Sequence, residues 1–146
     1  MGFSVSGSAA IVFAGMFVAF GMFYTATANT AEQVSEANAD WQDGALAQQN
    51  TAIEITSATH YVGNDSLVIR VNNTGAVGLS VEETDLLVDN EYQTAFSERS
   101  VEGDASTSLW LPGQTLRYNV STASQPSRVK LVTETGVAGT EVVQSG

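Results

Sequence analysis

The sequence predicts an N-terminal transmembrane α-helix that extends into a helical stalk and is followed by an all-β antiparallel sandwich. Three features lead to this prediction: an uncharged apolar stretch up to Ala31, a polar segment with helical spacing, and a long region where apolar and polar residues alternate between turns. They divide the chain into a membrane anchor (residues 1–30), a stalk (31–50) and a sandwich domain outside the membrane (51–146).

The first stretch contains no charged side chain before Glu32. A helix that rises 1.5 Å per residue needs about 20 apolar residues to cross roughly 30 Å of hydrocarbon, and the segment from Ser8 to Ala28 supplies that length. A cleaved signal peptide is the alternative, with Ala26-Thr27-Ala28 as the cleavage site. No Lys or Arg precedes this site, as one would in such a signal, so we expect a retained anchor.

The predicted anchor has two unequal faces. At 100° per residue, an aromatic stripe lies beside a stripe of small residues. Small residues let helix backbones approach closely in lipid, so the helix is predicted to pair with its own copies or with a partner's anchor. The alternative is that Ala and Gly are simply common in membrane spans. The aromatic stripe is Phe13, Phe17, Phe20 and Tyr24, and the small stripe is Ala10, Ala14, Gly21, Thr25 and Ala28.

The charges near the predicted anchor indicate its orientation in the membrane. No Lys or Arg occurs before Arg70, so the positive-inside rule has little to act on. The acidic residues that follow the span, from Glu32 to Asp43, favour the outer side when the cell interior is electrically negative. We therefore expect the sandwich to be extracytoplasmic.

The composition limits the partners and the environment. Asp and Glu number 16 against 5 Lys and Arg, a net charge of −11, so no basic patch is available for nucleic acid. Self-repulsion of this charge is screened in concentrated salt, where the Debye length falls to about 3 Å. We predict a halophilic archaeal source, with an acidic mesophile protein as the alternative. The chain has no cysteine, which excludes cysteine nucleophiles and thiolate metal sites.

The stalk and the sandwich differ in periodicity. Between Asn29 and Asn50, a thin apolar edge recurs at helical spacing, which predicts either a packed stalk or a linker helix without specific contacts. After Asn50 the apolar residues alternate, as in half-buried strands. Seven to eight short strands separated by turns predict an immunoglobulin-like sandwich. The alternating sets are Ile53 and Ile55; Leu67, Ile69 and Val71; Val77, Leu79 and Val81; Leu116, Tyr118 and Val120; and Val129, Leu131 and Thr133.

Trp110 is the largest side chain of the predicted sandwich. The segment from Leu109 to Leu116 is predicted to be a strand, a Pro112-Gly113 turn and a second strand. Alternation places Trp110 on the opposite face from Leu109 and Leu111. It is therefore either a core residue between the sheets, which is the commoner use, or an exposed contact for a partner.

The sequence offers few candidates for catalysis or metal binding. His60 is the only histidine, and nothing around it resembles a nucleophile elbow, so an ordinary strand histidine is preferred. The acidic run from Glu82 to Glu91 offers oxygen ligands for a divalent cation but lacks the EF-hand pattern, so a solvated edge is preferred. We expect no enzyme activity, no catalytic residue, no cofactor and no metal.

Three N-glycosylation sequons begin at Asn64, Asn72 and Asn119. All three follow the predicted anchor, and the first two lie at predicted turns. This placement is consistent with a domain outside the membrane.

Five stretches together resemble haloarchaeal archaellum accessory proteins of the F type, with the G type as a close relative. They are Met1 to Phe17, Glu32 to Val34, Val71 to Gly75, Val88 to Asn90 and Leu111 to Gly113. The resemblance implies a stator component with a membrane helix and an outside domain. It also implies binding to the surface-layer glycoprotein and association with the G-type accessory protein; self-association is expected from the small stripe.

An archaellin- or pilin-like filament subunit is the second hypothesis, because these proteins also join an apolar helix to a β-sandwich. Their helix follows a short basic leader that a peptidase removes. Here the apolar run begins within a few residues of Met1, without a preceding Lys or Arg. We therefore favour the anchored accessory protein, and in the alternative the same helix forms the filament core.

Overall fold

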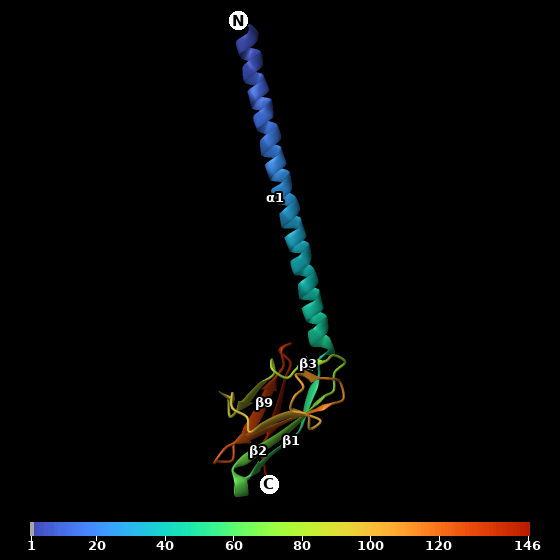
Figure 1. The fold of residues 1–146 in the computed structure, drawn as a ribbon, viewed down its shortest axis with the longest axis vertical. Helices are drawn as coiled ribbons and strands as arrows, with labels where there is room; N and C mark the ends of the chain where they lie inside the picture. Colours follow the sequence, from blue (N-terminus) through green and yellow to red (C-terminus); the bar gives the residue numbers. More distant parts are fainter. Residues whose placement is uncertain (1) are drawn as a thin grey trace. The chain divides into compact units, whose positions relative to one another are not determined.

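A computed structural model describes the backbone of residues 2–146 and the side chains of residues 7–146, so the part of the anchor and of the resemblance at Met1 lies outside the described residues. The chain divides into two compact units, Met1–Asp43 and Gly44–Gly146. The helix α1 (Gly2–Asn50) begins the chain, and the β-strands follow it (Figure 1). The last turns of α1 therefore belong to the same compact unit as the strands.

Helix α1 covers both the predicted anchor and the predicted stalk. The sequence contains no proline before Pro112, so nothing in this stretch removes a backbone donor from the helix. The division into anchor and stalk near residue 30 remains a prediction.

The second unit consists of short strands and a single-turn 3₁₀ helix, η1 (Val62–Asn64), which connects the first two strands. The strands are β1 (Ile53–Tyr61), β2 (Ser66–Asn73), β3 (Leu79–Ser80), β4 (Asp85–Val88), β5 (Glu91–Tyr92), β6 (Glu98–Val101), β7 (Leu109–Trp110), β8 (Thr115–Ser121), β9 (Arg128–Val132), β10 (Ala138–Val142) and β11 (Gln144–Ser145).

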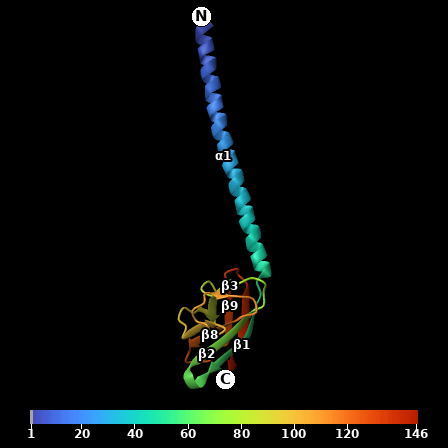
Figure 2. The same ribbon diagram turned by 45° about the vertical axis from the view of Figure 1, so that its right-hand side comes forward.

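Two sheets form the sandwich. The larger has the strand order β11-β1-β2-β8-β6, and the other has the order β10-β9-β4-β5. Strands β1, β2 and β8 lie side by side in the larger sheet, with β9 in the other layer (Figure 2). A further pair, β3 with β7, is antiparallel, with Leu79 opposite Trp110.

The chain passes from one sheet to the other between its last two strands, β10 and β11. Strand β10 is antiparallel to β9, whereas β11 pairs with β1 in parallel, with Thr59 opposite Gln144. Val143 lies between the two strands and is 5% exposed. Burial of this one side chain marks the crossing, which joins the two sheets along one side of the sandwich.

The core lies between the sheets and comes from the alternating positions. Leu67, Ile69 and Val71 of β2 are completely buried, as are Leu116 and Tyr118 of β8. Across the interface they meet buried residues of the second sheet, including Leu86, Val129 and Leu131. Each such side chain stabilises the fold by about 1.5–3 kcal/mol relative to an exposed position.

The structure confirms the predicted fold class, an N-terminal apolar helix followed by an immunoglobulin-like antiparallel sandwich. Two details differ. The predicted strand from Val77 to Val81 shortens to Leu79–Ser80, and the acidic run contains strand β4. Strand β4 forms because Leu86 and Val88 alternate inward and are buried, while the acidic residues stay on the outside.

Candidate functional site

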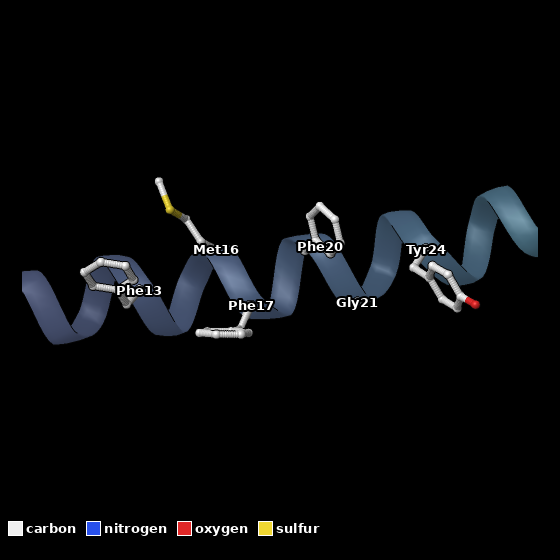
Figure 3. A pocket seen from close by; sticks show the side chains of 6 residues that line it. All are labelled: Phe13, Met16, Phe17, Phe20, Gly21 and Tyr24. Atoms are coloured by element: carbon white, nitrogen blue, oxygen red, sulfur yellow. The ribbon is translucent and has the colours of Figure 1, made fainter.

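The aromatic side of α1 is an exposed apolar surface on the first unit. A shallow hollow between side chains is lined by Phe13, Met16, Phe17, Phe20, Gly21 and Tyr24, which follow one another along the helix (Figure 3). Phe17 is 78% exposed. An apolar surface of this kind is unfavourable in water and suits contact with lipid or with another apolar helix.

Gly21 connects this hollow to the predicted stripe of small residues. A Cβ atom on Gly21 would have no neighbour within 4 Å, so the backbone is open to close approach at this point. Ala10 and Ala14 are also exposed. The geometry is compatible with helix packing by Ala10, Ala14 and Gly21 beside Phe13, Phe17 and Phe20, and this packing stays a prediction.

The polar side chains near the end of the apolar stretch bond within the helix. The hydroxyl of Thr25 donates to the carbonyl of Met22 at 3.0 Å, and Thr27 donates to the carbonyl of Phe23 at 2.8 Å. Thr30 donates to the carbonyl of Ala26 at 2.8 Å. Hydroxyls paired in this way enter lipid at a lower cost than unpaired ones. By length and composition, α1 is sufficient to cross a membrane.

The end of α1 is bound tightly by the sandwich, within the second compact unit. The carbonyl of Asn50 accepts a hydrogen bond from the N–H of Ala76 at 2.8 Å. The carbonyl of Ala52 accepts from the N–H groups of Thr74 and Gly75, both at 2.9 Å. Together the residues Asn50–Ala52 and Thr74–Ala76 form a connection that we call the helix clamp.

Two side chains reinforce the helix clamp. The hydroxyl of Thr51 donates to the carbonyl of Ala47 at 2.7 Å, which satisfies one of the free carbonyls in the last helical turn. The amide of Gln48 donates to the carbonyl of Thr135 at 3.1 Å, on the turn between β9 and β10. The helix end is therefore held from two separate loops of the sandwich.

Asn73 holds the loop that forms one side of the helix clamp. This side chain is completely buried. Its Nδ2 donates to the carbonyls of Val77 at 2.8 Å and Trp110 at 3.1 Å, and its Oδ1 accepts from the N–H of Gly75 at 3.0 Å. A buried amide with all these partners fixes the loop conformation, because losing any partner would leave a polar group unpaired.

A model of the archaeal-type flagellin family matches residues 2–142. The chain belongs to this family. The sequence-based resemblance to archaellum proteins is thereby confirmed at the level of the family, and the preference for the F type over the G type stays a prediction. No curated protein matches the chain.

Solved structures show distant similarity. The chain is similar to the archaellum periplasmic stator protein FlaG from Sulfolobus acidocaldarius, with 17% identity and a TM-score of 0.44, over 62% of this chain and 97% of that one. It is also similar to the FlaF and FlaG stator complex from the same organism, with 15% identity and a TM-score of 0.42, over 61% of this chain and 85% of that one. A CARDB domain of PF1109 from Pyrococcus furiosus matches with 15% identity and a TM-score of 0.39, over 66% and 94%.

Trp110 is a core residue, the preferred of the two alternatives, and the other alternative, an exposed contact for a partner, is wrong. Its side chain is 0% exposed, and its indole N–H donates to the carbonyl of Gln114 at 2.8 Å. The alternation argument holds, because Leu109 and Leu111 on either side are 50% and 45% exposed. The indole belongs to the hydrophobic core, as does Leu79, its cross-strand neighbour in the β3–β7 pair.

The acidic run and His60 take part in the fold. The carboxylate of Asp89 accepts hydrogen bonds from the N–H groups of Ser127 at 2.9 Å and Arg128 at 3.0 Å, which joins two loops. Within the described part of the chain, no three acidic or histidine side chains are close enough to hold a metal ion. His60 is 1% exposed, and its Nε2 lies 2.9 Å from the carbonyl oxygen of Thr122.

The sequence did not predict the helix clamp. Its only sequence signal is the Asn73-Thr74-Gly75 turn, which gives no indication that the loop returns to the end of the helix. Of the three sequons, Asn64 lies on an exposed turn, whereas Asn72 and Asn119 lie half-buried in strands.

Proposed function

We propose that this protein is a structural stator component of the archaellum motor. Helix α1 anchors the protein in the cell membrane, and the sandwich binds the surface layer on the extracytoplasmic side. The protein carries force between the two and needs no catalytic residue. It acts in a halophilic archaeon, where concentrated salt screens its net charge of −11.

The helix clamp is the observation that carries this proposal. A stator component has to resist torque, so the end of its helix has to be held firmly by the sandwich. Backbone hydrogen bonds from Thr74, Gly75 and Ala76 hold the chain where it leaves the helix. A flexible Gly- or Ser-rich linker, the usual connection between independent domains, would not transmit a twist in this way.

The apolar helix supports the anchoring. No charged side chain occurs before Glu32, and the hydroxyls of Thr25, Thr27 and Thr30 are paired within α1. The aromatic side of α1 remains exposed and suits contact with lipid. The stripe of Ala10, Ala14 and Gly21 suits contact with a second copy or with the anchor of a partner.

The expected partners are the surface-layer glycoprotein, the G-type accessory protein and further copies of this chain. A stator role is also what the names of the Sulfolobus acidocaldarius proteins state for those proteins. For this chain, the argument rests on the helix clamp and the apolar helix.

The test uses the full-length protein in detergent at molar salt with isolated surface-layer protein. We expect saturable binding, and we expect cells that lack the gene to assemble filaments yet move poorly. Complementation with Gly75→Ala should restore motility incompletely, whereas Gly63→Ala should restore it fully. Absence of binding together with normal motility of the deletion strain would overturn the proposal.

A filament subunit is the second candidate, and the description of the matching family, archaeal-type flagellin, favours it. In that case the aromatic side of α1 would pack against neighbouring helices in the filament core. Mass spectrometry of the native N-terminus separates the two candidates. A shortened start indicates a processed subunit, and a start at Met1 or Gly2 indicates the anchor.

A further inference from the structure

The three sequons occupy different structural settings. Asn64 ends η1, at the tip of the hairpin that joins β1 to β2, and it is exposed. Asn72 and Asn119 are half-buried within β2 and β8, which are inner strands of the larger sheet. N-linked glycans are bulky and hydrophilic, so a usable acceptor has to lie on an open surface.

The tip around Asn64 has room for a large substituent. The side chain of Val62 is 66% exposed, and a Cβ atom on Gly63 would meet nothing within 4 Å. The Oδ1 of Asn64 accepts a hydrogen bond from the hydroxyl of Ser66 at 2.9 Å. No bond from Nδ2 of Asn64 to any residue with a described side chain is present, so the nitrogen that would receive a sugar is unoccupied.

The third residue of this sequon, Ser66, lies where its strand pairings end. Ser66 forms the last rung of the β1–β2 hairpin, opposite Tyr61, and it also pairs with Ser121 at the end of β8. Its side chain is buried, and its exposure requires the end rungs of both strand pairs to fray. Hairpin ends fray at low cost compared with the middle of a sheet.

Asn72 is a poor acceptor. Its backbone is paired on both sides, with Glu54 on β1 and Thr115 on β8. Its Oδ1 accepts from the hydroxyl of Thr115 at 2.9 Å. The next residue is the buried Asn73, which holds the loop of the helix clamp, so opening this sequon would dismantle the joint.

Asn119 is a poor acceptor for a different reason. Its Oδ1 is buried without a hydrogen-bond partner among the described residues. Its backbone lies between Val68 of β2 and Glu98 of β6, and its carbonyl also accepts from the N–H of Ser97. Attachment of a sugar here would require separating strands of the larger sheet.

We propose that Asn64 is the glycosylation site of this chain and that the other two sequons remain unmodified. The donor is a glycan carried on a lipid phosphate. A bond forms between Nδ2 of Asn64 and the anomeric carbon of the sugar as the bond from that carbon to the phosphate oxygen breaks. The lipid phosphate leaves with the bonding electron pair, and the amide nitrogen loses one proton. This inference rests on the extracytoplasmic placement in the proposed function.

The position of Asn64 separates the glycan from the helix clamp. Strand β1 runs from Ile53, next to the clamp, to Tyr61, next to η1 (Figure 1). The glycan therefore attaches at the end of the sandwich away from the last turn of α1. There it covers the exposed side chains of Tyr61 and Val62, which otherwise contact water.

The test is the intact mass of the full-length protein purified from the membranes of cells that make it. We expect the wild-type mass to exceed the polypeptide mass by one glycan. Asn64→Gln should remove this increment completely, and Asn72→Gln and Asn119→Gln should keep it. Peptide mapping should place the glycan on the peptide that contains Asn64. An unmodified wild-type protein, or a glycan on Asn72 or Asn119, would overturn the inference.

A cysteine reporter separates this inference from the proposed function. The natural chain has no cysteine, so Glu83→Cys at an exposed position introduces a unique thiol. Labelling of intact cells by a membrane-impermeant maleimide, with no glycan on Asn64, would overturn the inference alone. Labelling only after lysis would place the sandwich in the cytoplasm and overturn both.

Discussion

Gly75 and Asn50 approach so closely that no side chain fits between them. A Cβ atom built on Gly75 would lie 2.5 Å from the carbonyl oxygen of Asn50 and 2.6 Å from the backbone nitrogen of Ala52. Real Cβ atoms do not come this near to backbone, so any substitution must move the loop or the end of the helix. The absence of a side chain at position 75 is what makes the helix clamp possible.

Gly75→Ala should therefore loosen the helix clamp. We expect the free energy of unfolding of the sandwich to fall by about 1–3 kcal/mol, the usual cost of overpacking. Chemical denaturation of the detergent-solubilised protein measures the change. The matched control is Gly63→Ala, where a Cβ meets nothing within 4 Å and the stability should stay within about 0.5 kcal/mol. Equal stability of the two variants would show that the close approach does not matter.

Trp110→Phe should destabilise the sandwich by about 1–3 kcal/mol. The change removes the indole N–H that donates to the carbonyl of Gln114, leaves that acceptor without its partner and opens space in the core. Leu109→Ser on the same strand is the control, because Leu109 is 50% exposed and should contribute little. If Leu109→Ser proved the more harmful change, Leu109 would belong to a buried interface.

Tyr118→Phe should leave the stability unchanged or raise it by about 1 kcal/mol. The Tyr118 side chain is 0% exposed, and its hydroxyl has no hydrogen-bond partner among the described residues. Burial raises the pKa of this hydroxyl. Removing an unpaired buried hydroxyl avoids its desolvation cost while the ring keeps its contact with Phe96 at 5.1 Å. A marked loss of stability would show that a water molecule or a partner satisfies the hydroxyl.

Glu98 and Arg117 should make the larger sheet sensitive to acid. The hydrogen bond and the charge of Arg117 lower the pKa of Glu98 from its ordinary value. A carboxylate with a lowered folded-state pKa stabilises the fold above its unfolded pKa, and this contribution is lost as the pH falls through the folded-state pKa. Denaturation of Glu98→Gln between pH 7 and pH 3 should show a smaller drop in stability than the wild type. Identical pH profiles would contradict the pairing.

Association of α1 should depend on the small residues. Ala14→Leu and Gly21→Leu add bulk to the stripe where backbones are expected to meet, so they should weaken self-association in bilayers while insertion stays complete. Energy transfer between labelled copies in lipid vesicles measures this. Val12→Leu, on the opposite side of the helix, is the control. If all three variants associate like the wild type, α1 is a plain anchor.

The sequence was informative wherever a side-chain pattern repeats locally. The uncharged run before Glu32 predicts the apolar helix, and alternation predicts β1, β2, β8 and β9, because burial on one face imposes a period of two. Alternation also gave the correct relative orientation of Trp110 and Leu109. It could not decide which of the two faces the core, since both faces carry large apolar side chains.

Features that depend on distant contacts were not predictable. In the sequence, Val143 looks like any strand residue. Its burial at the crossing depends on two sheets that come together only in the fold. The same holds for Asn73, which in the sequence is a turn residue but in the structure bonds to Trp110, far away along the chain. Gly75 is one of 13 glycines, and only the approach of Asn50 distinguishes it.

The most direct test of the stator role is where the protein remains when filaments are sheared from motile cells. Quantitative mass spectrometry of the sheared filaments and of the washed membranes measures its distribution. The account predicts that the protein stays with the membranes and co-purifies with surface-layer protein. Its presence in the filaments as a stoichiometric component would contradict the account and identify a filament subunit.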